Sequence, residues 1–210
     1  MNVIVLAKAP VPGRCKTRLC PPCSPREAAV LAKAALLDTL DAAVRSAGDR
    51  VVLALDGDPG DWLPRQVDVI GQRGVGLDQR IAAAFDDAGG PALLIGMDTP
   101  QIVSKTLDGA LRALARPDID AVLGPALDGG WWAAGLRRAD RRAFLGVPMS
   151  TARTGAAQAR RFRTLGLRVA RLPALRDVDR IADAYAVAAE APWSRFAAAV
   201  AALPASRLAG

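Results

Sequence analysis

Residues 92–100 read ALLIGMDTP, and this stretch decides the fold class. Residues 92–97 form the most continuously apolar segment of the chain, which is typical of a strand buried on both faces. A carboxylate, Asp98, and a proline, Pro100, follow the segment directly. Parallel sheets that helices cover on both faces have this pattern, so the stretch predicts a central strand of an α/β sheet.

Working outward from this strand, strand-like and helix-like segments alternate along the chain. Strands are expected at residues 3–7, 51–55, 67–70, 121–123, 131–136 and 167–172, and helices after Ser24 and at 78–88, 101–115, 151–164 and 179–202. Ser24, Pro25 and Glu27 form a capping box that begins the first helix, and Gly48 is expected to end it. The alternation predicts a three-layer αβα sandwich with a mostly parallel sheet, organised as a single domain over residues 1–210.

Composition excludes several function classes. The chain has 210 residues and no histidine, which rules out Ser-His-Asp triads, Cys-His dyads and His-ligated zinc. Its three cysteines, Cys15, Cys20 and Cys23, are too few for a disulfide framework or a four-cysteine zinc site, so we expect ordinary loop cysteines. No apolar run approaches the roughly 18–20 residues of a membrane helix, and no signal peptide is recognisable. We therefore expect a cytoplasmic protein without a membrane span.

The net charge of +7 comes mostly from arginine, which suits recognition of phosphate or carboxylate groups. Residues 51–100 carry 3 basic and 8 acidic side chains, and aromatic residues make up only 4% of the chain. This distribution disfavours a continuous nucleic-acid-binding surface, so we expect no nucleic-acid partner.

Loops at the carboxyl ends of the strands are where ligands bind in such sheets, which directs attention to residues 8–23, 71–77, 96–101 and 124–130. The first of these loops places Lys8, Arg14, Lys16 and Arg18 within eleven residues, beside Gly13. Clustered cations and free backbone amides suit an oligophosphate, although the loop lacks the spacing of a P-loop or a dinucleotide fingerprint. By itself, a basic, proline-rich loop is more often a solvated surface than a binding site.

Three further segments carry chemistry with two interpretations each. Asp98 either binds Mg²⁺ together with phosphate oxygens or caps the helix that follows. The alternating aspartates from Asp177 to Asp183 either complete a metal site or complement a helix dipole. Asp128-Gly129-Gly130, followed by two tryptophans, either forms a tight turn at a site or leads into core packing.

Together and in this order, these segments resemble the nucleotide-diphospho-sugar transferase superfamily, which has the glycosyltransferase-A fold. They are most similar to an uncharacterised bacterial glycosyltransferase-like family related to 2-phospho-lactate guanylyltransferase and to the molybdenum-cofactor nucleotidyltransferases. The resemblance covers about residues 2–190 and rests on the motifs at 7–19, 96–100, 125–135 and 177–183. Residues 76–80 depart from the order of the family's Asp-Leu-Gly-x-Arg stretch, Arg180 replaces a threonine, and residues 148–150 lack an aromatic.

The resemblance implies a role for particular residues. The nucleotide is expected to contact Lys8, Pro12, Gly13, Arg14, Lys16, Arg18 and Arg80. Mg²⁺ or Mn²⁺ is expected on Asp98 and Asp179, and the acceptor on Asp128, Gly129, Gly130 and Ser150. Arg14, Lys16 and Asp98 are the residues expected to carry the reaction.

The leading functional hypothesis is a Mg²⁺-dependent transferase that uses a nucleoside triphosphate or a nucleotide-sugar. Within it, we favour nucleotidyl transfer to a small phosphorylated acceptor, with release of pyrophosphate. Positioning and charge neutralisation dominate such chemistry, so a chain without histidine can perform it. Glycosyl transfer from a nucleotide-sugar is the nearest alternative, and a non-catalytic nucleotide-binding module is another. The base, the acceptor and the oligomeric state are left open, including whether the Ala-rich stretch from Trp193 to Gly210 contacts a second subunit in a homodimer.

Overall fold

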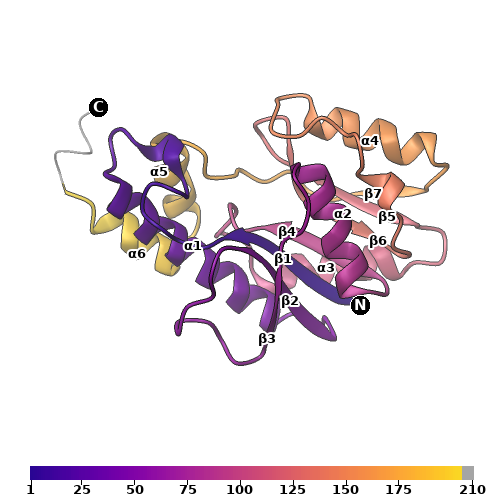
Figure 1. Ribbon diagram of the computed structural model, residues 1–210, viewed down its shortest axis with the longest axis horizontal. Helices are drawn as coiled ribbons and strands as arrows, with labels where there is room; N and C mark the ends of the chain where they lie inside the picture. Colours follow the sequence, from indigo (N-terminus) through magenta and orange to yellow (C-terminus); the bar gives the residue numbers. More distant parts are fainter. Residues whose placement is uncertain (205–210) are drawn as a thin grey trace.

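A seven-stranded sheet forms the centre of the computed structural model, which describes residues 1–204 (Figure 1). Its strands are β1 (Asn2–Lys8), β2 (Arg50–Asp56), β3 (Val67–Gly71), β4 (Ala92–Gly96), β5 (Ala121–Pro125), β6 (Trp131–Leu136) and β7 (Val169–Arg171). Their order across the sheet is β3-β2-β1-β4-β6-β5-β7, which confirms β4 as the central strand. Only β6 is antiparallel to its neighbours, β4 and β5.

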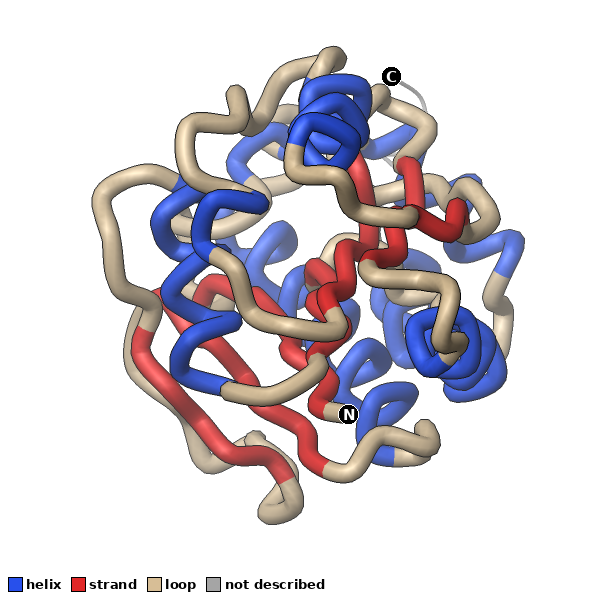
Figure 2. Tube along the Cα trace, turned by 90° about the vertical axis from the view of Figure 1, so that its right-hand side faces the viewer, coloured by secondary structure: helices blue, strands red, loops and turns tan. Residues whose placement is uncertain are grey.

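Helices cover both faces of the sheet, as Figure 2 shows. On one face lie α1 (Pro25–Val44) and α3 (Ser104–Ala115), and on the other lie α2 (Leu77–Ala88), the short η2 (Arg141–Ala143) and α4 (Thr154–Thr164). Successive side chains of β1 point alternately into the apolar cores on the two faces of the sheet. Val3 and Val5 are buried in the same cluster as residues of α1, whereas Ile4 is buried with residues of α2. The predicted three-layer αβα sandwich with a mostly parallel sheet is therefore confirmed.

A third apolar cluster lies at one end of the molecule. Here α5 (Ile181–Glu190) and α6 (Arg195–Ala201) pack against α1 and the short η1 (Thr17–Leu19). Leu19, Leu31 and Phe196 are fully or almost fully buried in this cluster. In Figure 1, the segment after β7 crosses the molecule to reach α5. The cluster therefore fixes the loop after β1 close to the segment that precedes α5.

Several expected helix boundaries differ from the structure; among them, the helix expected at 151–164 begins at Thr154. The single helix expected at 179–202 is two helices, because Pro192 has no N–H to continue α5 and the Ser194 hydroxyl caps α6. The capping box of Ser24 and Glu27 begins α1 as expected, but the helix ends at Val44. Gly48 packs instead against β1, where an added Cβ would lie 2.8 Å from a methyl group of Val3.

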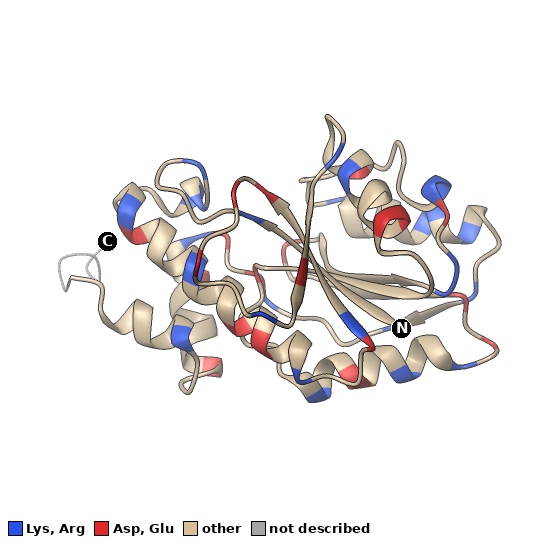
Figure 3. Cartoon of the chain, turned by 60° about the horizontal axis from the view of Figure 1, so that its bottom comes forward, with Lys and Arg blue, Asp and Glu red and all other residues tan. Residues whose placement is uncertain are grey.

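The third helix begins at Ser104 rather than at residue 101, so Asp98 does not cap it. No disulfide joins the three cysteines, which all lie within residues 1–204, and Cys15 and Cys23 are buried. Their role as ordinary loop residues stays a prediction. Figure 3 shows basic and acidic residues interspersed along the chain.

Within residues 1–204, no helix combines the length and the apolar character that a membrane span requires. Residues 205–210 of the Ala-rich C-terminal stretch lie outside the described part.

Candidate functional site

The carboxyl ends of the central strands open onto a cleft of about 690 Å³. Its lining comes from several separate segments of the chain. These are the loop after β1, residues 72–80, the loop after β4, the β5–β6 turn, residues 149–154, Asp177 and Asp179. Each loop that the sequence marked as functional therefore reaches one cavity. This is the place where open α/β sheets bind ligands.

One wall of the cleft is basic. Lys8, Arg14, Lys16 and Arg18 all line it, as expected from the sequence. Pro12 and Gly13 do not belong to the lining, so their direct contact with a nucleotide stays a prediction. The φ of Gly13 is +76°, a conformation that favours glycine, and it turns the loop just before Arg14.

Lys16 joins three segments of the site. Its Nζ lies 2.5 Å from Asp98 Oδ1 and also donates to the Val178 carbonyl. The Val178 N–H in turn donates to the Asp98 carbonyl at 2.8 Å. The Lys16 side chain is only 9% exposed, against 48% for Asp98. The loop after β1, the loop after β4 and the segment before α5 are thus held together at one ammonium group.

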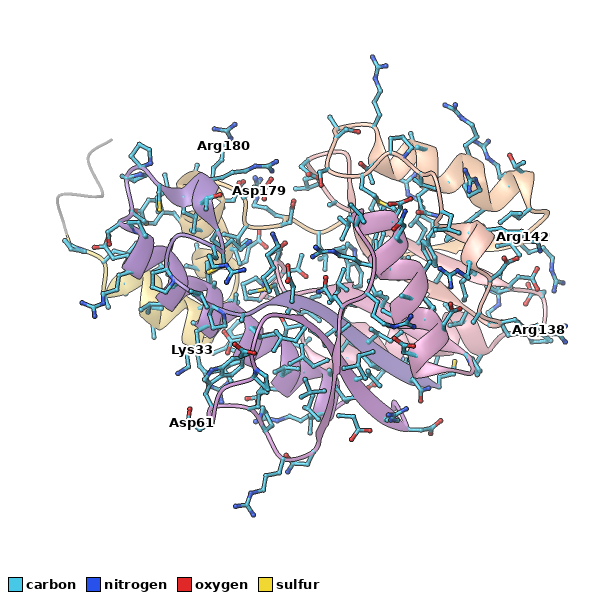
Figure 4. The ribbon with its side chains drawn as sticks, in the orientation of Figure 1. Lys33, Asp61, Arg138, Arg142, Asp179 and Arg180 are labelled. Carbon is cyan, nitrogen blue, oxygen red and sulfur yellow. The ribbon has the colours of Figure 1, made fainter. Side chains whose placement is uncertain are left out.

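Arg18 makes a second ion pair across the cleft. Its Nη1 lies 2.6 Å from Asp179 Oδ2. This pair is more open to solvent, with the Arg18 side chain 61% exposed. In Figure 4, Asp179 lies on the segment that leads to α5, whereas Arg180 points away from the molecule. Arg180 does not line the cleft. The arginine that stands here in place of the family's threonine therefore does not place its side chain in the site.

Three carboxylates next to the basic loop form a candidate cation site. Oxygens of Asp128, Asp177 and Asp179 lie within 4.8 Å of one another. Burial, together with the nearby carboxylates of Asp128, Asp179 and Asp98, raises the pKa of Asp177 to about 6. A bound cation would relieve this repulsion, and an all-oxygen donor set suits Mg²⁺ or Mn²⁺.

This group differs from the pair inferred from the sequence. Asp179 belongs to it as expected, but Asp98 is salt-bridged to Lys16, and Asp128 was assigned to the acceptor. The sequence reasoning left Asp177 out of the metal set. Its spacing from Asp179 was the available signal, because alternate residues of an extended segment point to the same side.

A second wall of the cleft contains Asp128, Gly130 and Ser150, and their contact with an acceptor stays a prediction. Gly129 does not line the cleft. Its φ is +92°, and an added Cβ would lie 2.1 Å from the Ala152 carbonyl oxygen. The side of Gly129 where a Cβ would stand packs against the turn before α4, so its contact with an acceptor stays a prediction. Sequence reasoning missed Trp131, Met149, Thr151 and Thr154, which complete this wall.

Residues 72–80 form the remaining wall. The Gln72 side-chain amide donates to the carbonyls of Ala7 and Ala54, which joins the ends of β1 and β2. Arg80 lines the cleft, but its guanidinium is already bonded to Asp56, at 2.8 Å, and to the Gly74 carbonyl. Arg80 therefore braces this loop, and its contact with a nucleotide stays a prediction.

The amino-acid sequence matches the model of a protein family. The model of a family described as "Uncharacterized protein conserved in bacteria (DUF2064)" matches residues 30–151, more than half of the chain. No curated protein matches the chain.

Solved structures share the fold over almost the whole chain. A Desulfovibrio desulfuricans G20 protein with the provisional name nucleotide-diphospho-sugar transferase is 26% identical, with a TM-score of 0.85 over 95% of this chain and 93% of that one. CMP:2-keto-3-deoxy-manno-octonic acid synthetase complexed with CTP is 13% identical, with a TM-score of 0.58 over 91% and 97%. A manganese complex of Rv0371c from Mycobacterium tuberculosis H37Rv is 20% identical, with a TM-score of 0.53 over 89% and 96%. The chain has the nucleotide-diphospho-sugar transferase fold.

Proposed function

Since the chain belongs to the DUF2064 family, we propose that it is a metal-dependent transferase whose donor substrate is a nucleotide. One observation carries the proposal: Lys and Arg side chains and a group of carboxylates line a single cleft. Transfer from a nucleotide needs both, because cations bind the phosphates while carboxylates hold the metal ion that neutralises them. The CTP bound to the synthetase of the same fold supports a nucleotide donor.

Asp128, Asp177 and Asp179 would hold the ion, with Asp98 beside them. The manganese complex of the mycobacterial relative supports a divalent metal in this fold. When bound, the ion would supply positive charge next to the phosphate oxygens of the donor. The phosphates would be bound by the cations of the basic wall, Lys8, Arg14, Lys16 and Arg18.

Nucleotidyl transfer is the reaction that we favour. The acceptor would attack the α-phosphorus, and the bond to the β-phosphate oxygen would break to release pyrophosphate. Arg14 and Lys16 would neutralise the charge that develops on this leaving group. Four cations in one loop suit the departure of pyrophosphate from a triphosphate.

Glycosyl transfer is the second candidate, and the wall of the cleft that contains Asp128, Gly130 and Ser150 favours it. Among the described residues lining that wall, Ser150, Thr151 and Thr154 offer hydroxyl groups and Asp128 a carboxylate, whereas none is Lys or Arg. A phosphorylated acceptor would therefore have to bind the same cations of the basic wall as the phosphates of the donor. A neutral acceptor that carries hydroxyl groups would not, and the provisional name of the Desulfovibrio relative points the same way.

The products distinguish the two reactions. Purified protein is incubated with Mg²⁺, a panel of small acceptors, and either the nucleoside triphosphates or nucleotide-sugars. Release of pyrophosphate identifies nucleotidyl transfer, and release of a nucleoside diphosphate identifies glycosyl transfer. Asp179→Asn should lose nearly all turnover, whereas Asp118→Asn, on a surface turn outside the cleft, should retain it. Full activity of Asp179→Asn, or neither product from any donor, would contradict the proposal.

A further inference from the structure

We infer that Lys16 and Arg18 also serve as internal counterions, which occupy the site's carboxylates until metal and nucleotide arrive together. This inference rests on the proposed function and adds a role to it. The same two cations would bind carboxylates in the resting protein and phosphates in the loaded one. Metal alone should therefore bind weakly, and metal and nucleotide should bind cooperatively.

The ion pairs show the resting half of this exchange. Lys16 is paired with Asp98, and Arg18 with Asp179. Asp98 and Asp179 are the two carboxylates that the sequence assigned to the metal. Asp128 and Asp177 are the other two acids that line the cleft near them, and neither forms an ion pair with a described residue. A divalent cation that enters alone must therefore approach carboxylates beside two positive charges that are already in place.

The other cleft cations are available for incoming phosphates. Lys8 and Arg14 line the same basic wall, and neither has a carboxylate partner among residues 1–204. A triphosphate can therefore first contact these two side chains. Lys16 and Arg18 can then exchange a carboxylate for a phosphate oxygen, which frees Asp98 and Asp179 without leaving any charge unpaired.

Lys16 should dominate this effect. Its side chain is almost fully buried, so solvent screens its charge much less than that of the exposed Arg18. Its backbone is also in the left-handed region, with a φ of +48°, which non-glycine residues rarely adopt. The contacts of its ammonium group with Asp98 and the Val178 carbonyl hold the side chain in place there. Release of that group would remove a constraint on a strained residue.

Binding of Mn²⁺ alone tests the inference, measured by titration calorimetry and by the electron paramagnetic resonance signal of free Mn²⁺. Lys16→Met should bind Mn²⁺ about 10-fold more tightly than the wild type, a typical size for the coupling between two sites. Arg18→Gln should gain about 2–5-fold, as expected for an exposed ion pair. Lys16→Arg, which keeps the charge, should stay close to the wild type.

Lys8→Met is the matched control, because it removes a positive charge from the same cleft without breaking an ion pair. It should change Mn²⁺ affinity by less than about twofold in physiological salt. Circular dichroism at the titration temperature establishes that each variant is folded. Equal or weaker Mn²⁺ binding by folded Lys16→Met would overturn the inference, because Lys16 would then only hold the loops together. An equal gain in Lys8→Met would also overturn it.

Failure of the proposed function looks different. In that case neither the wild type nor any variant would bind Mn²⁺, and triphosphates would give no Mg²⁺-dependent thermal stabilisation. If such stabilisation is present and Lys16→Met binds Mn²⁺ as the wild type does, the transferase proposal stands and only the counterion role is lost.

Discussion

At the scale of single residues, the Lys16–Asp98 pair is the contact on which the site's resting geometry most depends. The ammonium group is nearly buried and has two acceptors, Asp98 and the Val178 carbonyl. Asp98→Asn removes the negative charge that neutralises this shielded ammonium group, so it should lower the free energy of unfolding by about 1–3 kcal/mol.

A double-mutant cycle measures this coupling directly. Urea unfolding of the metal-free wild type, Asp98→Asn, Lys16→Met and the double variant should give a coupling energy of about 0.5–3 kcal/mol, with the double variant less destabilised than the sum of the single ones. Strict additivity would mean that the pair does not act as a unit.

Asp177 predicts a pH dependence of opposite sign to that of an ordinary paired aspartate. Its pKa is raised to about 6 in the folded protein, from a usual value of 3.8. Between these values the folded chain binds more protons at this residue than the unfolded chain does. The contribution of Asp177 to stability is therefore greatest below about pH 4, and it is lost as the pH rises through about 6.

Thermal unfolding from pH 4 to 8, with a chelator present, checks this prediction. Relative to Asp177→Asn, the wild type should lose stability as the pH rises through about 6 and run parallel to it above about pH 7. The comparison cancels the other titrating carboxylates. Parallel curves throughout the range would show that the pKa of Asp177 is not raised.

At the scale of elements, the β5–β6 turn is built on close packing with the start of α4. The Gly155 N–H donates to the Gly129 carbonyl at 2.9 Å, and no side chain has room between the two segments. Gly129→Ala should therefore displace the turn and destabilise the protein by about 1–3 kcal/mol. Gly71→Ala is the control, since an added Cβ there meets nothing within 4 Å. Equal urea midpoints for the two variants would contradict this packing role.

Elements that local chemistry determines could be predicted from the sequence, and those that tertiary contacts determine could not. The capping box at Ser24 and the apolar run of β4 depend on neighbouring residues, and both are confirmed. The break at Pro192 was also local, and the sequence reasoning overlooked it. The role of Gly129 was not readable, because the segment that it packs against follows more than twenty residues later in the chain.

At the scale of the whole molecule, the site depends on an arrangement that no local pattern contains. The α5–α6 pair packs on α1 and η1, and it thereby brings Asp177 and Asp179 to the loop after β1. The sequence identified the loop after β1 and residues 177–183 as functional. It could not show that Asp128 and Asp177 complete a group with Asp179, or that Lys16 and Arg18 pair with acids more than eighty residues away.

The central claim, a nucleotide site that needs a divalent metal, is tested most directly by melting temperature. The wild type and Asp179→Asn are heated with each nucleoside triphosphate and with nucleotide-sugars, in the presence of Mg²⁺ or of a chelator. A ligand at about 100 times its dissociation constant adds about 2.7 kcal/mol of stability, which raises the melting temperature visibly. We predict stabilisation of the wild type by at least one nucleotide with Mg²⁺, and its loss in the chelator and in Asp179→Asn. Stabilisation that is indifferent to Mg²⁺, or none with any nucleotide, would contradict the account.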